Sequence, residues 1–189
     1  MLSFHRGCTF WTRPISQSGT LSNTYLPIWP DIMLTLLSSR KRISKKKHAE
    51  HNFTVNDYTL FWRNLAGRRG GGVAVYVNRR LSADVWTCPV DESQFKLLWI
   101  WVQTQWHTMF VSALYHPPKP LHQSTELLDH IEAGISTLTT AYHAVTDVLA
   151  GDFNTLDDSE VVSHTVMHSI VNRPTWAVNI LDRVYVNEM

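Results

Sequence analysis

The sequence predicts one mixed α/β domain in which a run of strands is followed by a helix and then by further strands. Several segments between residues 58 and 114 have the length and alternation of strands, with no helix between them. Residues 127–142 instead carry apolar side chains at spacings of three and four, as a helix does. The chain has 189 residues, of which 44% are hydrophobic, so it can bury one core and a single folded domain is expected.

The regular pattern starts near residue 53. Residues 1–52 are predicted to be an irregular, partly disordered basic region with one possible strand at 31–37, and residues 53–189 to be the folded domain. The basic run at 40–47 is typical of a solvated segment; contact with phosphate and a nuclear-import signal are the alternatives.

The folded part is expected to contain six strands and one long helix. The strands are predicted at 58–62, 73–77, 96–103, 108–114, 148–152 and 180–186, and the helix at 127–142. The strands before the helix follow one another directly, so they are expected to pair antiparallel. Ser124 or Thr125 is expected to cap the helix, which should pack on the sheet and return the chain to the strand that ends at Asp152.

Polar residues stand at the ends of three of these strands. Gly151 is expected to break one strand with a turn, so that Asp152 and Asn154 point the same way from the sheet edge. A carboxylate can accept a proton or hold a divalent cation, and a neutral amide can orient a water or a phosphate oxygen. Tyr115 follows the 108–114 strand and Asp182 lies in the middle of the last predicted strand, so both are expected at this edge.

Each of these residues also has a purely structural interpretation. Asp152 could form a turn or cap a helix, and Tyr115 could be a half-buried aromatic before the prolines that follow it. Asp182 could pair with an arginine. Their occurrence together, in this order along the chain, favours a functional site.

Five blocks in this order carry a resemblance to a known family. They are Arg68–Tyr76, Leu114–Pro118, Gly151–Asn154, Pro174–Thr175 and Leu181–Asp182. As an ordered set they resemble the endonuclease domain of non-LTR retrotransposon polyproteins, a branch of the exonuclease, endonuclease and phosphatase superfamily. The resemblance implies a partial four-layer α/β/β/α sandwich, incomplete at both ends, with two mixed sheets face to face and helices outside.

The resemblance also implies an activity, which is hydrolysis of phosphodiester bonds in DNA with Mg²⁺ or Mn²⁺ and no other small-molecule cofactor. Asp152 would act as general base toward the attacking water, and Asn154 would hold that water or a phosphate oxygen. Both residues would lie at the metal. The ion would neutralise charge that develops on the phosphate and help the leaving oxygen to depart.

The remaining site residues follow from the same resemblance. Tyr115 would touch the scissile phosphate, and Asp182 would orient a catalytic histidine and raise its basicity. Thr175 and Arg173 would line the rim that binds the substrate phosphate.

The sequence departs from the family pattern at three important points. The early asparagine of the family's first strand has no counterpart here, since Asn23 is the nearest and its context does not match. A metal-binding glutamate ordinarily follows the strand predicted at 31–37, but Leu36 or Leu37 stands there and no glutamate precedes Glu50. The closing Ser, Asp, His motif is absent before Met189, so the chain is expected to be a truncated copy. A smaller departure is Trp176, where an arginine would be usual. We therefore expect an endonuclease that is weak or inactive in this form.

Composition limits the location and the partners. The formal net charge is +1, so affinity for DNA must come from local basic patches. Cys8 and Cys88 make no disulfide framework, and the longest apolar run, Leu97–Val102, is far shorter than a membrane helix requires. The expectation is an intracellular protein without a membrane segment, nuclear if it is functional.

Two other functions and one other metal site stay open. One alternative is a non-catalytic nucleic-acid-binding module that uses the 40–47 run with arginines at 68, 69, 79 and 80. Another is a phosphatase or phospholipase of the same superfamily, which the fold does not exclude. His164 and His168, four residues apart, could share a helix face as metal ligands, although the sequence indicates no third ligand.

Overall fold

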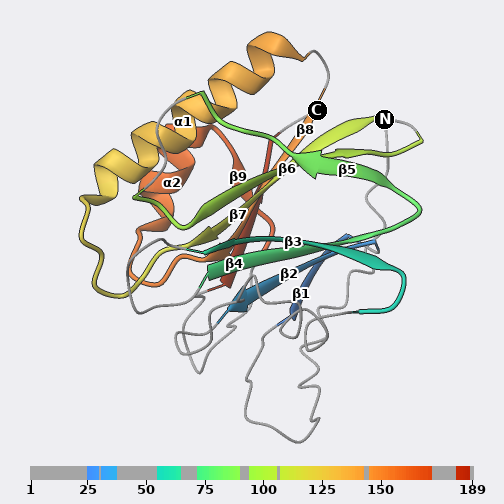
Figure 1. Ribbon diagram of the computed structural model, residues 1–189. Helices are drawn as coiled ribbons and strands as arrows, with labels where there is room; N and C mark the ends of the chain where they lie inside the picture. Colours follow the sequence, from blue (N-terminus) through green and yellow to red (C-terminus); the bar gives the residue numbers. More distant parts are fainter. Residues whose placement is uncertain are drawn as a thin grey trace, which may run out of the picture.

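The strands form two sheets that lie face to face, and two helices lie against one of them (Figure 1). This computed structural model describes residues 25–29, 31–37, 55–64, 72–89, 94–105, 107–142, 145–171 and 182–187. The boundary predicted at residue 52 falls outside these ranges, as do the basic run at 40–47 and most of the glycine-rich segment at 70–72.

The smaller sheet has four antiparallel strands in the order β1-β2-β4-β3. These strands are β1 (Tyr25–Trp29), β2 (Ile32–Leu37), β3 (Tyr58–Asn64) and β4 (Gly72–Asn78). The sequence does not predict β1, because Pro27 and Pro30 interrupt regular structure. Proline is tolerated in an edge strand, where its missing N–H interrupts no ladder, and β1 lies at the edge of this sheet.

The larger sheet has six strands in the order β5-β6-β7-β8-β10-β9. They are β5 (Ser82–Val85), β6 (Leu97–Gln103), β7 (Thr108–Tyr115), β8 (Thr146–Asp152), β9 (His168–Ser169) and β10 (Asp182–Val186). The expected antiparallel pairing of consecutive strands is confirmed for β3 with β4 and for β6 with β7. The β7–β8 pair is parallel, and a helix makes the crossover between these strands. The short strands β5 and β9 were not predicted.

Two helices are present in the described part of the chain, α1 (Ser124–Ala141) and α2 (Asp158–Thr165). The prediction that Ser124 or Thr125 caps α1 is wrong: Gln123 is the cap residue, and its backbone N–H donates to Glu126 Oε2 at 3.1 Å. The sequence did not predict α2, which Asp157 caps by accepting bonds from the two backbone N–H groups at 159 and 160. Neither helix is long and apolar enough to cross a membrane.

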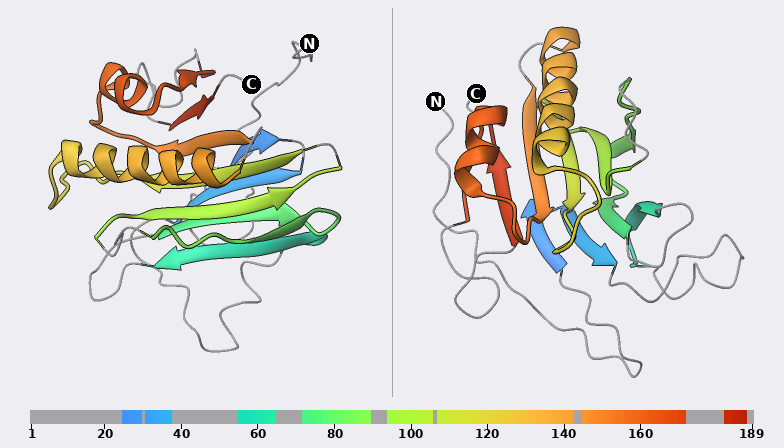
Figure 2. Two further views of the ribbon diagram at one scale, coloured as in Figure 1. Left: turned by 90° about the horizontal axis from the view of Figure 1, so that it is seen from above. Right: turned by 90° about the vertical axis from the view of Figure 1, so that its left-hand side faces the viewer.

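The larger sheet separates two hydrophobic cores, and Figure 2 shows the resulting layers. Alternate residues of its strands, such as Val111 and Val148, pack against β4 between the sheets. The other face carries Trp99 and packs against the helices. At Gly134 of α1 a Cβ atom would lie 2.7 Å from Trp99 Cζ2, so the absence of a side chain lets the helix approach the sheet closely.

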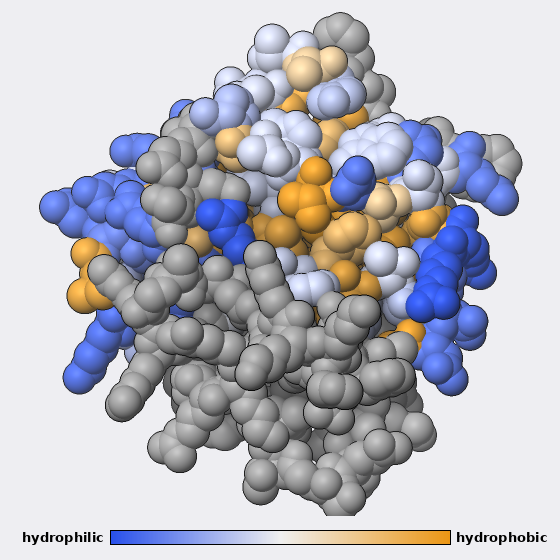
Figure 3. All heavy atoms as spheres, viewed as in Figure 1, coloured by the Kyte–Doolittle hydropathy of each residue, from blue (hydrophilic) through white to orange (hydrophobic). Residues whose placement is uncertain are grey.

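The described residues thus build three layers, helices on a sheet on a second sheet, and the predicted fold class is confirmed. They include no helix on the outer face of the smaller sheet, where a fourth layer would lie. Figure 3 shows hydrophobic side chains at the centre of one face, between hydrophilic side chains on both sides. Single exposed hydrophobic residues such as Leu121 and Val166 occur elsewhere on the surface.

Candidate active site

Tyr115, Asp152 and Asp182 form a row across three neighbouring strands. Tyr115 ends β7 and is the pairing partner of Asp152, which ends β8; Asp152 is in turn the partner of Asp182, the first residue of β10. In each strand the residue two positions further inside lies in the core between the sheets. Because side chains alternate along a strand, all three members of the row lie on that same face, at the end of the sandwich.

The structure therefore brings together the three strand-end residues that the sequence placed at one edge. One detail of the prediction is wrong. Asp182 is the first residue of β10 and not a residue in its middle, since the ladder with β8 begins at the Asp182–Asp152 pair.

Gly151 acts differently from the expectation. It does not break the strand, because β8 continues through Gly151 to Asp152. Its φ is +154°, and a Cβ atom at this position would lie 1.8 Å from the carbonyl oxygen of Leu114 on β7. Only glycine permits this close approach of the two backbones, which aligns Tyr115 with Asp152.

Asn154 lies in a turn just beyond β8, with a left-handed φ of +44°. Its Nδ2 donates to the carbonyl oxygen of His116 at 2.7 Å, and its backbone N–H donates to Asp152 Oδ1 at 3.1 Å. Hydrogen bonds, and not strand alternation, therefore set the direction of its side chain. The turn holds the Asp152 carboxylate and ties it to the chain that follows Tyr115.

Burial raises the pKa of the Asp152 carboxyl above its usual value. Hydrogen bonds from the side chain and the backbone of Asn154 oppose this effect by stabilising the ionised form. A carboxylate whose pKa lies above the usual value accepts a proton more readily. Its half-buried position and its raised basicity suit Asp152 to the role of a base toward water.

Lys96, directly before β6, is a site residue that the sequence did not indicate. Its carbonyl oxygen accepts the backbone N–H of Tyr115 at 2.9 Å, and its Nζ lies 4.5 Å from the centroid of the Tyr115 ring. Burial lowers the pKa of Lys96 and raises that of Tyr115, which the charge of Asp152 raises further. The sequence alone does not reveal this pair, because 18 residues lie between its members and only the register of β6 with β7 brings them together.

His116 is a buried residue that contacts the backbone of the Asp152 turn. It is 1% exposed, its backbone N–H donates to the carbonyl oxygen of Asp152 at 2.8 Å, and its Nδ1 lies 3.2 Å from that of Phe153. Burial lowers the pKa of its imidazole, so the ring is neutral near pH 7. In the sequence this histidine only separates Tyr115 from Pro117, and its contacts with the Asp152 turn could not be predicted.

Of the other predicted residues, two lie outside the described part of the chain and two do not form the expected pair. Thr175 and Arg173 lie outside the described residues, so their placement at a phosphate-binding rim stays a prediction. His164 and His168 do not share a helix face as supposed, since α2 ends at Thr165 and His168 belongs to β9.

The donor atoms of the row fit a hard divalent cation. Mg²⁺ and Mn²⁺ prefer oxygen ligands from carboxylates and amides. Asp152 and Asp182 are direct cross-strand neighbours on one face of the sheet, a relation that places Cβ atoms about 4.5–5.5 Å apart. Two carboxylates at that spacing favour a cation between or beside them, and the Asn154 turn adjoins this pair.

Comparison with known proteins supports the fold. The sequence matches no protein-family model and no curated protein. The structure resembles that of truncated TDP2 from Caenorhabditis elegans, with a TM-score of 0.58 and 14% identity over 84% of this chain and 71% of that chain. It also resembles the endonuclease domain of TRAS1, a telomere-specific non-LTR retrotransposon, with a TM-score of 0.52 and 12% identity over 69% of this chain and 65% of that chain.

A third similar structure is that of D. rerio TDP2 complexed with a single-strand DNA product, with a TM-score of 0.53 and 12% identity over 84% of this chain and 71% of that chain. At these identities the likeness is one of fold. The chain thus shares the fold of these structures, and one of them is an endonuclease domain of the kind that the resemblance in its sequence implied.

Proposed function

We propose that this chain is a DNA endonuclease of the retroelement type that hydrolyses phosphodiester bonds with Mg²⁺ or Mn²⁺, and that its turnover is weak or absent in this form. The row of Tyr115, Asp152 and Asp182 at the end of the sandwich is the observation that carries the proposal. The order of sequence blocks around these residues supports the retroelement branch.

Each group of the row has a role that its chemistry supports. The Asp152 carboxylate accepts a proton from the attacking water, and the Asn154 turn holds that carboxylate in place. The Tyr115 hydroxyl donates a hydrogen bond to an oxygen of the scissile phosphate. Lys96 contributes a positive charge next to Tyr115, where it attracts the phosphate.

Asp152 and Asn154 would hold the divalent cation, with Asp182 next to them. When bound, the ion supplies positive charge that stabilises the phosphate as negative charge develops on it. Asp182 would also orient a histidine, as the resemblance implies.

The low turnover that we propose follows from the leucine at the position where a metal-binding glutamate is expected. Leu36 or Leu37, at the end of β2, takes the place of the glutamate that the resemblance implies. A hard cation then lacks one carboxylate oxygen, and loss of one catalytic group typically costs about 10²- to 10⁴-fold in rate. Groups that act as a unit lose activity together, so the remaining rate is expected to be small.

A plasmid-nicking assay under single-turnover conditions tests the proposal. Supercoiled DNA is incubated with an excess of the full chain and Mg²⁺ or Mn²⁺, using the wild-type sequence, Asp152→Ala and the matched control Asp84→Ala. Asp84 is an exposed aspartate on β5, which β6 separates from the strands that carry the row. We expect slow nicking that EDTA abolishes, that Asp152→Ala reduces by at least about 10²-fold, and that Asp84→Ala leaves unchanged.

Two results would contradict parts of this proposal. Nicking that survives Asp152→Ala would show that the row is not the site. Fast multiple turnover by the wild-type chain, lost in Asp152→Ala, would locate the site correctly but would overturn the inference that the missing glutamate weakens it.

A nucleic-acid-binding module without catalysis is the second candidate. Arg79 and Arg80 are exposed in the turn after β4, although Arg80 also pairs with the carboxylate of Asp31. Under this alternative, DNA would bind without being cut, and affinity would fall steeply with salt because phosphate contacts release counterions. A phosphatase or phospholipase role would instead show as cleavage of a phosphomonoester or a phospholipid with no nicking of DNA.

A further inference from the structure

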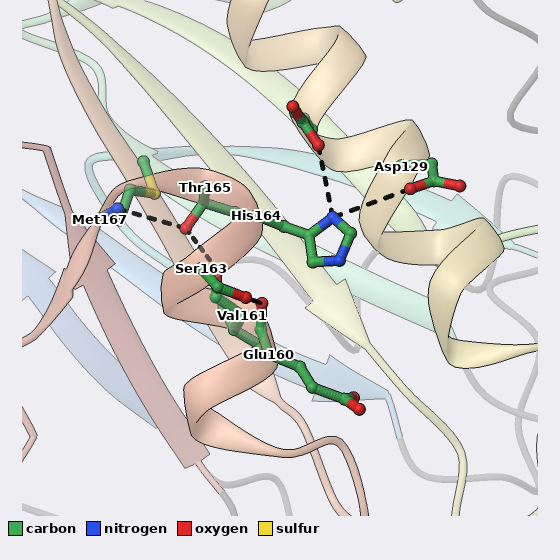
Figure 4. A network of polar contacts seen from close by, with 8 residues as sticks. Asp129, Glu160, Val161, Ser163, His164, Thr165 and Met167 are labelled. Atoms are coloured by element: carbon green, nitrogen blue, oxygen red, sulfur yellow. Dashed lines mark hydrogen bonds and ion pairs between the residues drawn. The ribbon is translucent and has the colours of Figure 1, made fainter.

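Three side chains capable of ligating a metal converge between α1 and α2, on the side of the larger sheet away from the smaller one. His164 Nδ1 lies 3.3 Å from Glu132 Oε2 and 3.7 Å from Asp129 Oδ1. Figure 4 shows the imidazole of His164 reaching from its helix toward Asp129 on the neighbouring helix. Asp129 and Glu132 are three residues apart, so they share one face of α1. One donor atom of each residue lies within 4.8 Å of the others.

The distances from His164 Nδ1 to the two carboxylate oxygens match the distances between ligands of a small transition metal. Zinc lies about 2.0–2.2 Å from imidazole nitrogen and carboxylate oxygen, so two ligands of a tetrahedral ion are about 3.3–3.6 Å apart. The distances from His164 Nδ1 to the two carboxylate oxygens, 3.3 and 3.7 Å, agree with this range to within about 0.1 Å. Three protein ligands leave the fourth position of the ion for water.

The charges around the cluster favour a cation. The two helices carry five carboxylates, three in α1 and two in α2, and neither helix contains a lysine or an arginine. The carboxylates are those of Glu126, Asp129, Glu132, Asp158 and Glu160. The basic side chains of these helices are histidines, and His164 is the one that contacts Asp129 and Glu132. Ion pairs at an exposed surface stabilise a protein only weakly, whereas a divalent ion would neutralise both carboxylates.

We propose that Asp129, Glu132 and His164 form a binding site for a transition metal of the Zn²⁺ class, which joins α1 to α2. The imidazole distinguishes this site from one for Mg²⁺, because nitrogen ligands favour zinc and its neighbours in the periodic table. The site is separate from the row of Tyr115, Asp152 and Asp182, which faces the opposite side of the larger sheet. Bound metal stabilises the packing of α2 on α1 and takes no part in hydrolysis.

Calorimetric titration of the untagged full chain with Zn²⁺ alone tests this site. The variants are His164→Ala and the matched control His168→Ala, which removes an exposed histidine four residues away on β9. Each is also prepared with Asp152→Ala, so that Zn²⁺ at the catalytic row is not counted. Loss of a supporting contact alone reduces metal affinity by about 10- to 100-fold. We expect His164→Ala to weaken binding by at least that much and His168→Ala to leave it unchanged.

Thermal unfolding gives a second measurement. Zn²⁺ is expected to raise the midpoint of the wild-type chain and of His168→Ala, and to leave that of His164→Ala unchanged, while excess Mg²⁺ gives no such shift. Circular dichroism without metal verifies that His164→Ala is folded. The site is refuted if the wild-type chain binds no Zn²⁺ at micromolar concentrations, or if a folded His164→Ala binds it as tightly as the wild type.

Discussion

The substitution Asp147→Asn is expected to stabilise the protein near neutral pH. Asp147 is the second residue of β8 and is 2% exposed, and its Oδ1 has no hydrogen-bond partner in the described part of the chain. Asn187 donates to the other carboxylate oxygen at 3.3 Å. Burial raises the pKa of this carboxyl from 3.8 to about 7, because the charged form loses its hydration.

The pKa shift fixes both the sign and the size of the effect. Between pH 3.8 and about 7 the folded chain keeps a proton that the unfolded chain has released. The contribution of Asp147 to the free energy of unfolding is therefore largest below pH 3.8. It decreases as the pH rises and becomes constant above about pH 7. A shift of about 3 units, at about 1.4 kcal/mol per unit, corresponds to about 4 kcal/mol. An amide does not titrate, so Asp147→Asn avoids this loss.

Urea unfolding followed by tryptophan fluorescence measures the effect. The advantage of Asp147→Asn over the wild type is expected to grow by up to about 1.4 kcal/mol per pH unit between pH 5 and 6, to grow less steeply as the pH approaches 7, and to stay nearly constant from pH 7.5 to 8.5. The exposed control Asp84→Asn should show no such trend. A difference that is the same at pH 5 and pH 8 would refute the reasoning, because it would mean that Asp147 is ionised in the folded chain at both values.

Two further substitutions test the packing that positions the candidate site. Gly151→Ala would place a Cβ atom 1.8 Å from a backbone oxygen of Leu114. We therefore expect the free energy of unfolding, measured with urea, to fall by at least about 3 kcal/mol. An unchanged midpoint would show that β7 and β8 are not in this contact. Tyr185→Phe removes a hydrogen bond of 2.6 Å from the phenol to Asp158 Oδ1, which links β10 to α2, and is expected to cost about 1–3 kcal/mol; a stability equal to the wild type would contradict that link.

Much of the larger sheet was predictable because its signals are local. Runs of apolar residues identified β6 and β7 of this sheet, and alternation identified β4 of the smaller sheet. Spacings of three and four identified α1, because they follow from burial of one face of a helix. The caps were harder to predict. Asp157 followed by Glu160 has the spacing of a capping box, and that pattern, had it been used, would have predicted α2.

The candidate site was predictable only in part for a physical reason. Strand ends and a favourable order of residues pointed to Tyr115, Asp152 and Asp182, and the sheet register brings them side by side. Lys96 and His116 could not be found in this way, because their proximity to the row depends on backbone pairing and on a turn that folds back. The Asp129–His164 contact likewise depends on how α2 packs on α1.

We propose that Asp152 and Asn154, with Asp182 next to them, hold a divalent cation beside the phosphate that Tyr115 contacts. Mn²⁺ broadens the NMR signals of nuclei close to it, so a titration of the isotope-labelled chain with substoichiometric Mn²⁺ measures where the ion lies. We expect broadening of the backbone amide signals of Tyr115, Asp152 and Asn154 and little effect at Asp84. In Asp152→Ala this pattern should be lost. Unchanged signals for the row, with or without broadening elsewhere, would contradict it.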